Sequence, residues 1–346
     1  MTEIQTQDFS YDLPRELVAY VPAELREEAR LMVLKREGRT IRHTRFREIT
    51  RYLRKGDVLV LNETRVIRAR LRGEKRPTGG RVDLLLLREA GRGSWEALVS
   101  PGRRIHVGTE ILIAGRYGAR VTGRLAGGKR VVEFETDDVM ALLEDVGEVP
   151  LPPYIKRAPQ DLDRERYQTV YAERNGSVAA PTAGLHFTNP LLEAISRKGV
   201  EIARLTLHVG LGSFRPVKEP DPTKHVLDPE YFEIDDACAG AVNRARNRGG
   251  RVVAVGTTTV RALETAAERF GRQELLPGAG WTEKMILPPY RFRFVDVLVT
   301  NFHLPRSTLL MLVSAFAGRR FVLEAYGEAV RRAYRFYSYG DAMIII

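Results

Sequence analysis

The chain has 346 residues, enough for one large domain or two ordinary ones with substantial hydrophobic cores. Hydrophobic residues make up 44% of it and charged residues 29%, which are typical values for a globular protein. The single cysteine, Cys238, excludes an intrachain disulfide and a cysteine-rich zinc site.

The formal net charge of +11, with many more arginines than lysines, favours a polyanionic partner such as a nucleic acid. A thermostable surface rich in arginine explains the same charge equally well. The six histidines show no HExxH motif and no close ligand spacing, so no metal is expected. Because no signal peptide or long apolar span is visible, we expect a cytoplasmic protein without membrane contacts. No feature of the sequence indicates an obligate protein partner.

The first 66 residues predict short elements of mixed type. A helix is expected over Pro22–Arg30, and the short apolar runs Leu31–Leu34 and Val58–Leu61 predict buried strands. The second strand ends in Asn62-Glu63-Thr64-Arg65. These side chains form either part of a polar site or a capped strand end with an ion pair.

Residues 67–149 have a different pattern, in which short strands alternate with glycine-containing turns and the first expected helix is Asp137–Asp145. The predicted strands are Val82–Leu87, Trp95–Val99, Thr109–Ile113, Ala119–Thr122 and Val131–Glu135. Five short strands at close spacing predict a small barrel or sandwich. The arginines in its turns either contact a nucleic acid backbone or are solvated.

These patterns predict an α/β main domain with a small all-β barrel domain inserted in it. The main domain is expected to have a mixed or barrel-like sheet built from strand–loop–helix units. We expect residues 1–66 and 150–346 to form this discontinuous domain and residues 67–149 to form the insertion. The proline-rich segment Pro150–Tyr154 makes the extended connection between them, and the basic pair Lys156-Arg157 follows it directly.

Three segments in the second half of the chain end in a polar loop followed by a helix. In the first, small residues around Gly184 let another group approach the backbone. His186 then precedes Thr188, the expected N-cap of a helix over Asn189–Arg197. The segment therefore holds a histidine near the start of a helix.

In the second segment, the strand Arg251–Val255 leads through a tight polar turn, Gly256–Thr259, into a helix over Val260–Phe270. Helix-start amides and threonine hydroxyls make a site for an anion or a polar ligand. Arg261 and Glu264 share one face of that helix. The turn is not a Walker A loop, because the Gly-Lys-Ser/Thr ending is absent.

In the third segment, the strand Asp296–Thr300 is followed by a loop with Asn301 and His303, and Pro305 prevents a direct run into a helix. Ser307 is the expected N-cap of a buried helix over Thr308–Ala317.

A further strand, Val200–His208, enters a glycine-rich loop in which His208 and Ser213 face candidate ligand space. Since ligands favour the carboxyl ends of strands in α/β sheets, we expect the loops around His186, Gly256–Thr259 and Asn301–His303 to meet at one pocket. For each single residue, a purely structural hydrogen bond is the alternative.

Eight segments together resemble a known family, the S-adenosylmethionine:tRNA ribosyltransferase-isomerases of queuosine biosynthesis. They are GDVLVLNETRVIRARL, PLPPYIKR, RYQTVYA, AAPTAGLHFT, LHVGLGSFRPV, GTTTVRALE, TNFHLPRSTLLMLVSAFAG and YSYGDAMII. They occur in the family's order and extend from about Asp12 to the C-terminus. The chain departs from the usual family pattern at Glu63, Arg68, Asp228 and Pro289. Asp228 replaces a histidine, so an imidazole at that position is not required.

The resemblance implies transfer and isomerisation of the ribosyl group of S-adenosylmethionine, which acts as co-substrate. The acceptor is 7-aminomethyl-7-deazaguanine (preQ1) at the tRNA wobble position, and the products are epoxyqueuosine-tRNA, adenine and methionine. It also implies an α/β domain with an inserted β-barrel. The partner is then a tRNA that carries preQ1 in its anticodon.

This chemistry needs proton transfers, which suit histidine or a tuned carboxylate. The candidate catalytic residues are therefore His186, His208, Glu264 and His303, with the roles of base and acid unassigned. Arg261 is expected to bind the methionine carboxylate or a tRNA phosphate. The other expected substrate-binding residues are Gly184, Ser213, Thr257, Thr258, Thr259 and Asn301, and the expected tRNA-binding residues are Lys156 and Arg157.

Two other classes of function remain open from the sequence. A methyltransferase acting on RNA would release S-adenosylhomocysteine, whereas the ribosyltransferase-isomerase releases adenine and methionine. A non-catalytic RNA-binding protein would not turn over S-adenosylmethionine at all.

Overall fold

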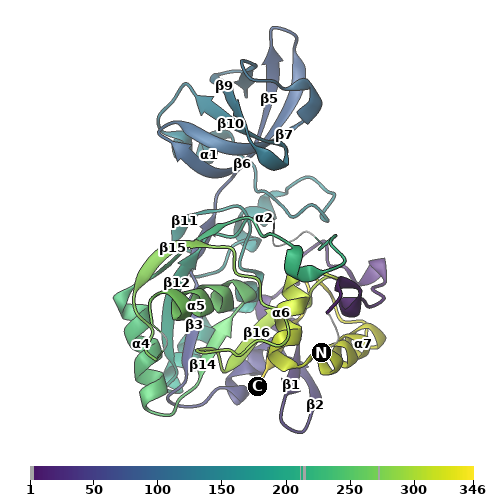
Figure 1. The fold of residues 1–346 in the computed structure, drawn as a ribbon, viewed down its shortest axis with the longest axis vertical. Helices are drawn as coiled ribbons and strands as arrows, with labels where there is room; N and C mark the ends of the chain where they lie inside the picture. Colours follow the sequence, from purple (N-terminus) through teal and green to yellow (C-terminus); the bar gives the residue numbers. More distant parts are fainter. Residues whose placement is uncertain (1–3, 211, 213–215, 272) are drawn as a thin grey trace. The chain divides into compact units, whose positions relative to one another are not determined.

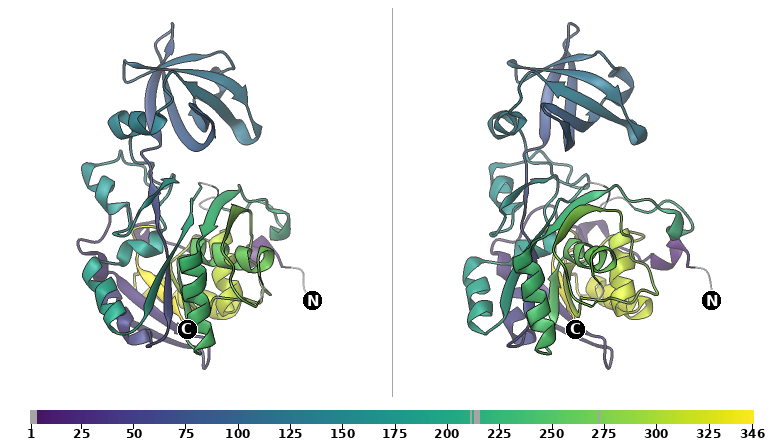
Figure 2. Two further views of the ribbon diagram at one scale, coloured as in Figure 1. Left: turned by 90° about the vertical axis from the view of Figure 1, so that its left-hand side faces the viewer. Right: turned by 60° about the vertical axis from the view of Figure 1, so that its left-hand side comes forward.

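A computed structural model of the chain describes residues 4–210, 212, 216–271 and 273–346. The chain divides into two compact units (Figures 1 and 2). Unit 1 comprises Met1–Thr64, Gln168–Arg174 and Ala180–Ile346, and unit 2 comprises Arg65–Tyr167 and Asn175–Ala179. Unit 2 is thus longer than the predicted insertion of residues 67–149, and that division of the chain stays a prediction.

Unit 1 is organised around one large mixed sheet, which has nine strands in the described part of the chain. In spatial order they are β15 (Gly278–Thr282), β13 (Glu230–Ile234), β12 (Glu201–Leu207), β3 (Val58–Asn62), β14 (Val252–Val255), β16 (Val297–Asn301), β17 (Ala342–Ile345), β1 (Arg30–Lys35) and β2 (Thr40–Arg45).

The central strands β12, β3, β14 and β16 run parallel to one another, so their carboxyl ends lie at the same edge of the sheet. β3, β14 and β16 are buried at every position, which matches their continuous apolar sequences. Strands covered on both faces need such sequences, because neither row of side chains reaches water. The sheet therefore fixes its carboxyl edge on a rigid core.

Helices cover both faces of this sheet. α3 (Asn189–Arg197) and the 3-10 helix Phe46–Tyr52 pack on one face through Phe46, Ile49, Leu191 and Ile195. The other α-helices of unit 1 in the described ranges are α4 (Asp236–Asn247), α5 (Thr257–Arg269), α6 (Thr308–Ala317) and α7 (Arg319–Arg331). In Figure 2, α3 (teal) and α4 (green) lie on opposite sides of the strands.

Unit 2 contains a closed antiparallel barrel. Going round it, the strands are β10 (Lys129–Phe134), β7 (Ser94–Ser100), β6 (Gly80–Gly91), β5 (Arg70–Arg76), β8 (Glu110–Ile113) and β9 (Tyr117–Arg124). The α-helices α1 (Val139–Val146) and α2 (Asp161–Arg166) also belong to this unit. Elsewhere in the chain, β4 (Thr64–Val66) pairs with β11 (Arg174–Ser177). The barrel is filled by inward side chains such as Leu71, Leu84 and Val121.

The predicted fold class, an α/β domain with a small inserted β-barrel, is confirmed. Two local predictions are wrong. Pro22–Arg30 holds only a 3-10 turn over Arg26–Glu28, because the strand β1 already begins at Arg30. Thr257–Thr259 form the first turn of α5 rather than a turn before it, since Gly256 (φ 91°) makes the change of direction alone.

Candidate functional site

The four parallel strands of unit 1 bring polar groups to the carboxyl edge of the sheet. His208 follows β12, Asn62 ends β3, Gly256 follows β14 and Asn301 ends β16. Ligands of open α/β sheets bind at this edge, because the loops that leave the strands are held by a rigid scaffold. A ligand-binding site is therefore expected at this edge of the sheet.

Two contacts link the three loops that were predicted to meet at one pocket, although neither His186 nor Gly256–Thr259 is among the residues that line the pocket described next. Asn301 Nδ2 lies 3.2 Å from His186 Nε2, which joins the end of β16 to the 3-10 helix Thr182–His186. A Cβ atom built at Gly256 would lie 3.8 Å from the Cβ of Ala183, so the start of α5 is also packed against that segment. Both contacts lie within unit 1.

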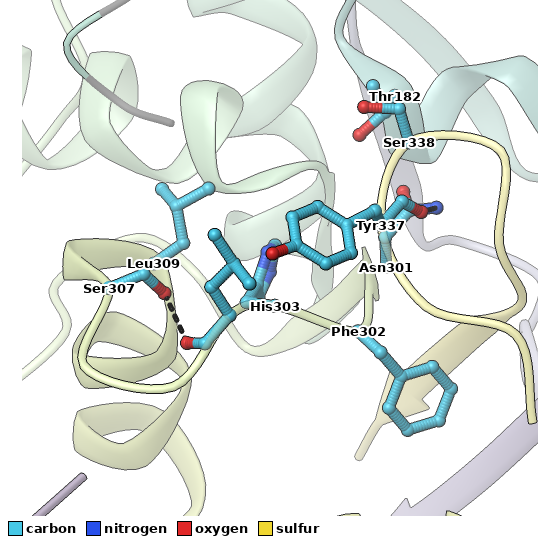
Figure 3. Close-up of a pocket in the computed structure, with 9 residues that line it drawn as sticks. Thr182, Asn301, Phe302, His303, Ser307, Leu309, Tyr337 and Ser338 are labelled. Carbon is cyan, nitrogen blue, oxygen red and sulfur yellow. Dashed lines mark hydrogen bonds between the residues drawn. The ribbon is translucent and has the colours of Figure 1, made fainter. Parts of the chain in front are cut away.

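A pocket opens beside this junction (Figure 3). Its lining is part polar and part apolar, and it comes from three separate segments of the chain, as the labelled side chains of Figure 3 show. The lining residues are Thr182, Asn301, Phe302, His303, Leu304, Ser307, Leu309, Tyr337 and Ser338. Sequence reasoning did not single out Thr182, Tyr337 or Ser338, although all three lie in segments that carry the family resemblance.

His186 is buried, and both of its ring nitrogens are engaged. Asn301 Nδ2 faces Nε2, and the ring also hydrogen-bonds the backbone of Arg26. Burial lowers the pKa of His186 to about 4, although the nearby Asp341 carboxylate acts in the opposite direction. The imidazole is therefore neutral at pH 7.

His303 is held in a similar way but keeps one nitrogen free. Its Nε2 lies 2.7 Å from the hydroxyl of Thr300, and its backbone N–H donates to the Tyr326 hydroxyl. Nδ1 has no hydrogen-bond partner in the described part of the chain. Burial lowers the pKa of His303 to about 3, so this imidazole is also neutral at pH 7.

His208 is the least buried of the three predicted histidines. Its Nδ1 lies 2.8 Å from the hydroxyl of Thr64, and its ring stacks on Tyr231 with centroids 5.8 Å apart. Burial lowers the pKa of His208 below its ordinary value, and the Glu233 carboxylate partly offsets this. Nε2 has no partner among the described residues.

The three threonines at the start of α5 are buried, and two of their hydroxyls already have protein partners. Thr258 Oγ1 accepts from Asn62 Nδ2 at 3.3 Å, and Thr259 Oγ1 donates to the carbonyl of Val255 at 2.7 Å. Asn62 Nδ2 also donates to the Leu207 carbonyl, so these contacts join β3, β12 and α5. Of the three hydroxyls, only that of Thr257 has no hydrogen-bond partner among the described residues.

Arg261 and Glu264 are both buried within unit 1, where each contacts other parts of the fold. Arg261 pairs with Glu230, and its Nε donates to the Lys284 carbonyl, while its second terminal nitrogen has no partner in the described residues. Glu264 accepts hydrogen bonds from the backbone N–H groups of Arg293 and Phe294. Its carboxylate thus fastens the 290–295 segment to α5.

Two further predicted residues have other surroundings. A Cβ atom at Gly184 would lie 2.1 Å from the Tyr171 hydroxyl, so this glycine makes room for a buried tyrosine. Ser213 lies outside the described residues.

Comparisons with known proteins agree over the whole chain. A family model described as "Queuosine biosynthesis protein" matches residues 6–345. A relative from Moorella thermoacetica, named S-adenosylmethionine:tRNA ribosyltransferase-isomerase, is 53% identical over 99% of this chain and 100% of its own length. A relative of the same name from Symbiobacterium thermophilum is 51% identical over 99% of this chain and 100% of its own. This chain belongs to the queuosine biosynthesis family.

A solved structure of the family is also similar. The crystal structure of the S-adenosylmethionine tRNA ribosyltransferase from Thermotoga maritima has 42% sequence identity and a TM-score of 0.57. The match covers 98% of this chain and 100% of that one.

The predicted tRNA-binding pair of this family member lies in unit 2. Lys156 is exposed, whereas Arg157 donates to the buried carboxylate of Asp163 at 2.6 and 2.8 Å. Both line a groove of about 370 Å³ together with Arg70 and Arg72. Arg72 lies 3.0 Å from Glu148, so Arg70 and Lys156 are the two cations of this groove that form no ion pair with a described residue.

Two kinds of feature have no candidate in the described ranges. No group of three or more histidine, cysteine, aspartate or glutamate side chains there is placed to hold a metal ion. No helix in that part of the chain combines the length and the apolar character needed to cross a membrane.

Proposed function

We propose that this chain transfers and isomerises the ribosyl group of S-adenosylmethionine onto preQ1 at the wobble position of tRNA, in the cytoplasm. Epoxyqueuosine-tRNA is formed, and adenine and methionine leave. The observation that carries the proposal is the match to relatives of this name over 99% of the chain and 100% of their length.

The reaction begins with proton removal, since the sulfonium makes the neighbouring ribose CH₂ acidic. His208 is suited to act as the general base, because its Nε2 has no partner among the described residues and its Nδ1 is anchored by Thr64. Its lowered pKa keeps a larger neutral fraction at pH 7 than a free histidine has. Replacing His208 by Ala is expected to remove about 10²-fold or more from kcat.

Arg261 is suited to bind the methionine carboxylate, because one of its terminal nitrogens has no partner in the described residues while another pairs with Glu230. Asn301 and His303 line the pocket, where they are placed to bind adenine or the preQ1 base. Glu264, Thr258, Thr259 and Gly184 fit structural roles, because each already contacts protein groups. Under this proposal Arg261→Ala mainly raises KM for S-adenosylmethionine.

The tRNA backbone fits the basic groove of unit 2. Arg70 and Lys156 supply the cations that form no ion pair with a described residue, and Arg157 shapes the groove wall through Asp163. Replacing Arg70 and Lys156 by Ala is expected to lower the log–log salt slope of tRNA binding by roughly 0.7–0.9 for each phosphate that is no longer neutralised. Replacing the exposed pair Arg103 and Arg104 is the matched control. An unchanged slope in the first variant contradicts this placement of the tRNA.

The reaction itself is tested by incubating the protein with S-adenosylmethionine and preQ1-tRNA. Free adenine and methionine are expected in equal amounts with modified tRNA. S-adenosylhomocysteine in their place would identify a methyltransferase. No turnover, with tRNA binding intact, would identify a non-catalytic RNA-binding protein.

A further inference from the structure

The side-chain amide of Asn301 has only one possible orientation. Its nitrogen lies 3.1 Å from the carbonyl oxygen of Tyr337, which can only accept a hydrogen bond. The NH₂ group must therefore be on this side, and its second hydrogen is available to His186 Nε2 at 3.2 Å. Both donors are then used, and Oδ1 is left without a partner in the described part of the chain.

The same contacts define what His186 does. Nε2 accepts from Asn301, so the ring proton is on Nδ1, where the ring meets the Arg26 backbone. No nitrogen of His186 remains to exchange a proton with a ligand. The imidazole is also packed against Phe46, with ring centroids 4.9 Å apart, so it is fixed in place.

The pocket beside Asn301 has a mixed apolar and polar lining of the kind that contacts heteroaromatic ligands. Leu304 and Leu309 supply apolar surface, and His303, whose Nδ1 has no partner among the described residues, is also part of the lining. Tyr337 also lines the pocket (Figure 3), and its backbone is in the left-handed region at φ 73°, which is strained for a bulky residue. This conformation presents the carbonyl that holds the Asn301 amide.

A buried side chain that is 2% exposed and lacks a partner for its acceptor needs a donor, because an unpaired buried polar group is costly. We propose that Asn301 Oδ1 accepts a hydrogen bond from the amino group of a heteroaromatic base in this pocket, and that His186 is a positioning residue that keeps the amide so oriented. The inference rests on the proposed function, under which the base is either adenine or the aminomethyl-deazaguanine of tRNA.

Glutamine replacements separate positioning from proton transfer. The side chain of His186→Gln still offers an acceptor to Asn301, so kcat/KM is expected to stay within about fivefold of wild type. His186→Leu removes the acceptor, and kcat/KM is expected to fall by tenfold or more. His208→Gln is the contrast, because a base cannot be replaced by an amide, and it should lose about 10²-fold. Equal losses in His186→Gln and His186→Leu would overturn the positioning role.

The ligand contact is tested by binding, independently of turnover. Adenine and purine, which lacks the amino group, are titrated calorimetrically into wild type and Asn301→Ala. Adenine is expected to bind wild type about tenfold more tightly than purine, and the ratio should fall to within about twofold in the variant. Thermal unfolding of both proteins checks that the variant is folded.

A second binding arm identifies the source of the base. An anticodon stem-loop with the 7-aminomethyl base is compared with one that has a 7-cyano group and so lacks that amine. If this pair, rather than adenine and purine, loses its difference in Asn301→Ala, the acceptor binds the tRNA base. If neither pair depends on Asn301, the inference is wrong. Absence of adenine release by wild type would instead refute the proposed function while these binding results stand.

Discussion

Glu264 and Asn301 are buried polar residues in neighbouring parts of unit 1, yet their hydrogen bonding differs. The Glu264 carboxylate accepts from the backbone of Arg293 and Phe294 and from the Tyr290 hydroxyl. The Asn301 amide uses both hydrogens on protein groups but leaves its oxygen without a partner in the described chain. One network is closed by the protein, and the other has an acceptor left over.

A buried polar residue near a predicted site can therefore have either of two roles. A closed network needs no ligand and contributes to folding, since every polar group has replaced its water. An open network keeps an unpaired group that a ligand can satisfy. Residues of the Glu264 network should therefore affect stability alone, and residues of the Asn301 network should affect binding and turnover in addition to stability.

The largest effect is expected for Glu264→Leu. Removing this carboxylate leaves several buried backbone N–H groups unpaired, so the free energy of unfolding should fall by about 3–5 kcal/mol. Denaturant unfolding monitored by circular dichroism measures it. Glu268→Ala is the matched control on the same helix, because that glutamate is more exposed and pairs with Lys284. Equal stability of Glu264→Leu and wild type would break the comparison.

Acid should destabilise the region of the Asn301 network next most strongly. Burial lowers the pKa of His186 to about 4 and that of His303 to about 3, whereas unfolded histidine titrates near 6.5. Below about pH 6.5 the unfolded chain binds protons that the folded chain does not, so stability falls as the pH falls. Between pH 7.5 and 5 the loss should be about 2 kcal/mol for each histidine.

Unfolding at both pH values in wild type and His186→Gln measures this loss. The variant should lose about half of the pH dependence that the two histidines give to wild type. A wild-type stability that rises toward pH 5 would contradict the buried, neutral state of these rings.

The smallest predicted effect compares two threonine hydroxyls. Thr300→Val removes the partner of His303 Nε2, and Thr265→Val removes the partner of the Thr282 hydroxyl. Each should cost about 1–2 kcal/mol of stability. Only Thr300→Val should also lower kcat/KM severalfold, because His303 lines the pocket. Similar turnover losses in both variants would remove the functional distinction between the hydroxyl that holds His303 and the closed Thr265–Thr282 pair.

Local patterns predicted many elements of the fold. Ser307 is the N-cap of α6, and α3 spans Asn189–Arg197 as expected, because caps and apolar runs are short-range signals. β5 was missed because only Leu71 of its residues faces the barrel core while charged residues dominate the rest. The helix α7 was missed too, although its sequence alternates apolar and charged residues at helical spacing.

The site was less predictable, because its contacts join distant parts of the chain. His186 and Asn301 were chosen from their loops, but their pairing across 115 positions depends on the strand order of the sheet. Glu264 shares a helix face with Arg261, which suggested a joint role. The backbone groups that bind it are about 30 positions further along, and no pattern near Glu264 indicates them.

The role of Asn301 as an open acceptor is tested by measuring adenine release from S-adenosylmethionine with preQ1-tRNA, in wild type and Asn301→Ala. Wild type should release adenine in step with modified tRNA. Asn301→Ala should stay folded, with some loss of stability from its missing hydrogen bonds to His186 and Tyr337, and it should lose tenfold or more in kcat/KM, since the open acceptor contributes to binding. A folded Asn301→Ala protein that releases adenine at the wild-type rate would contradict the account.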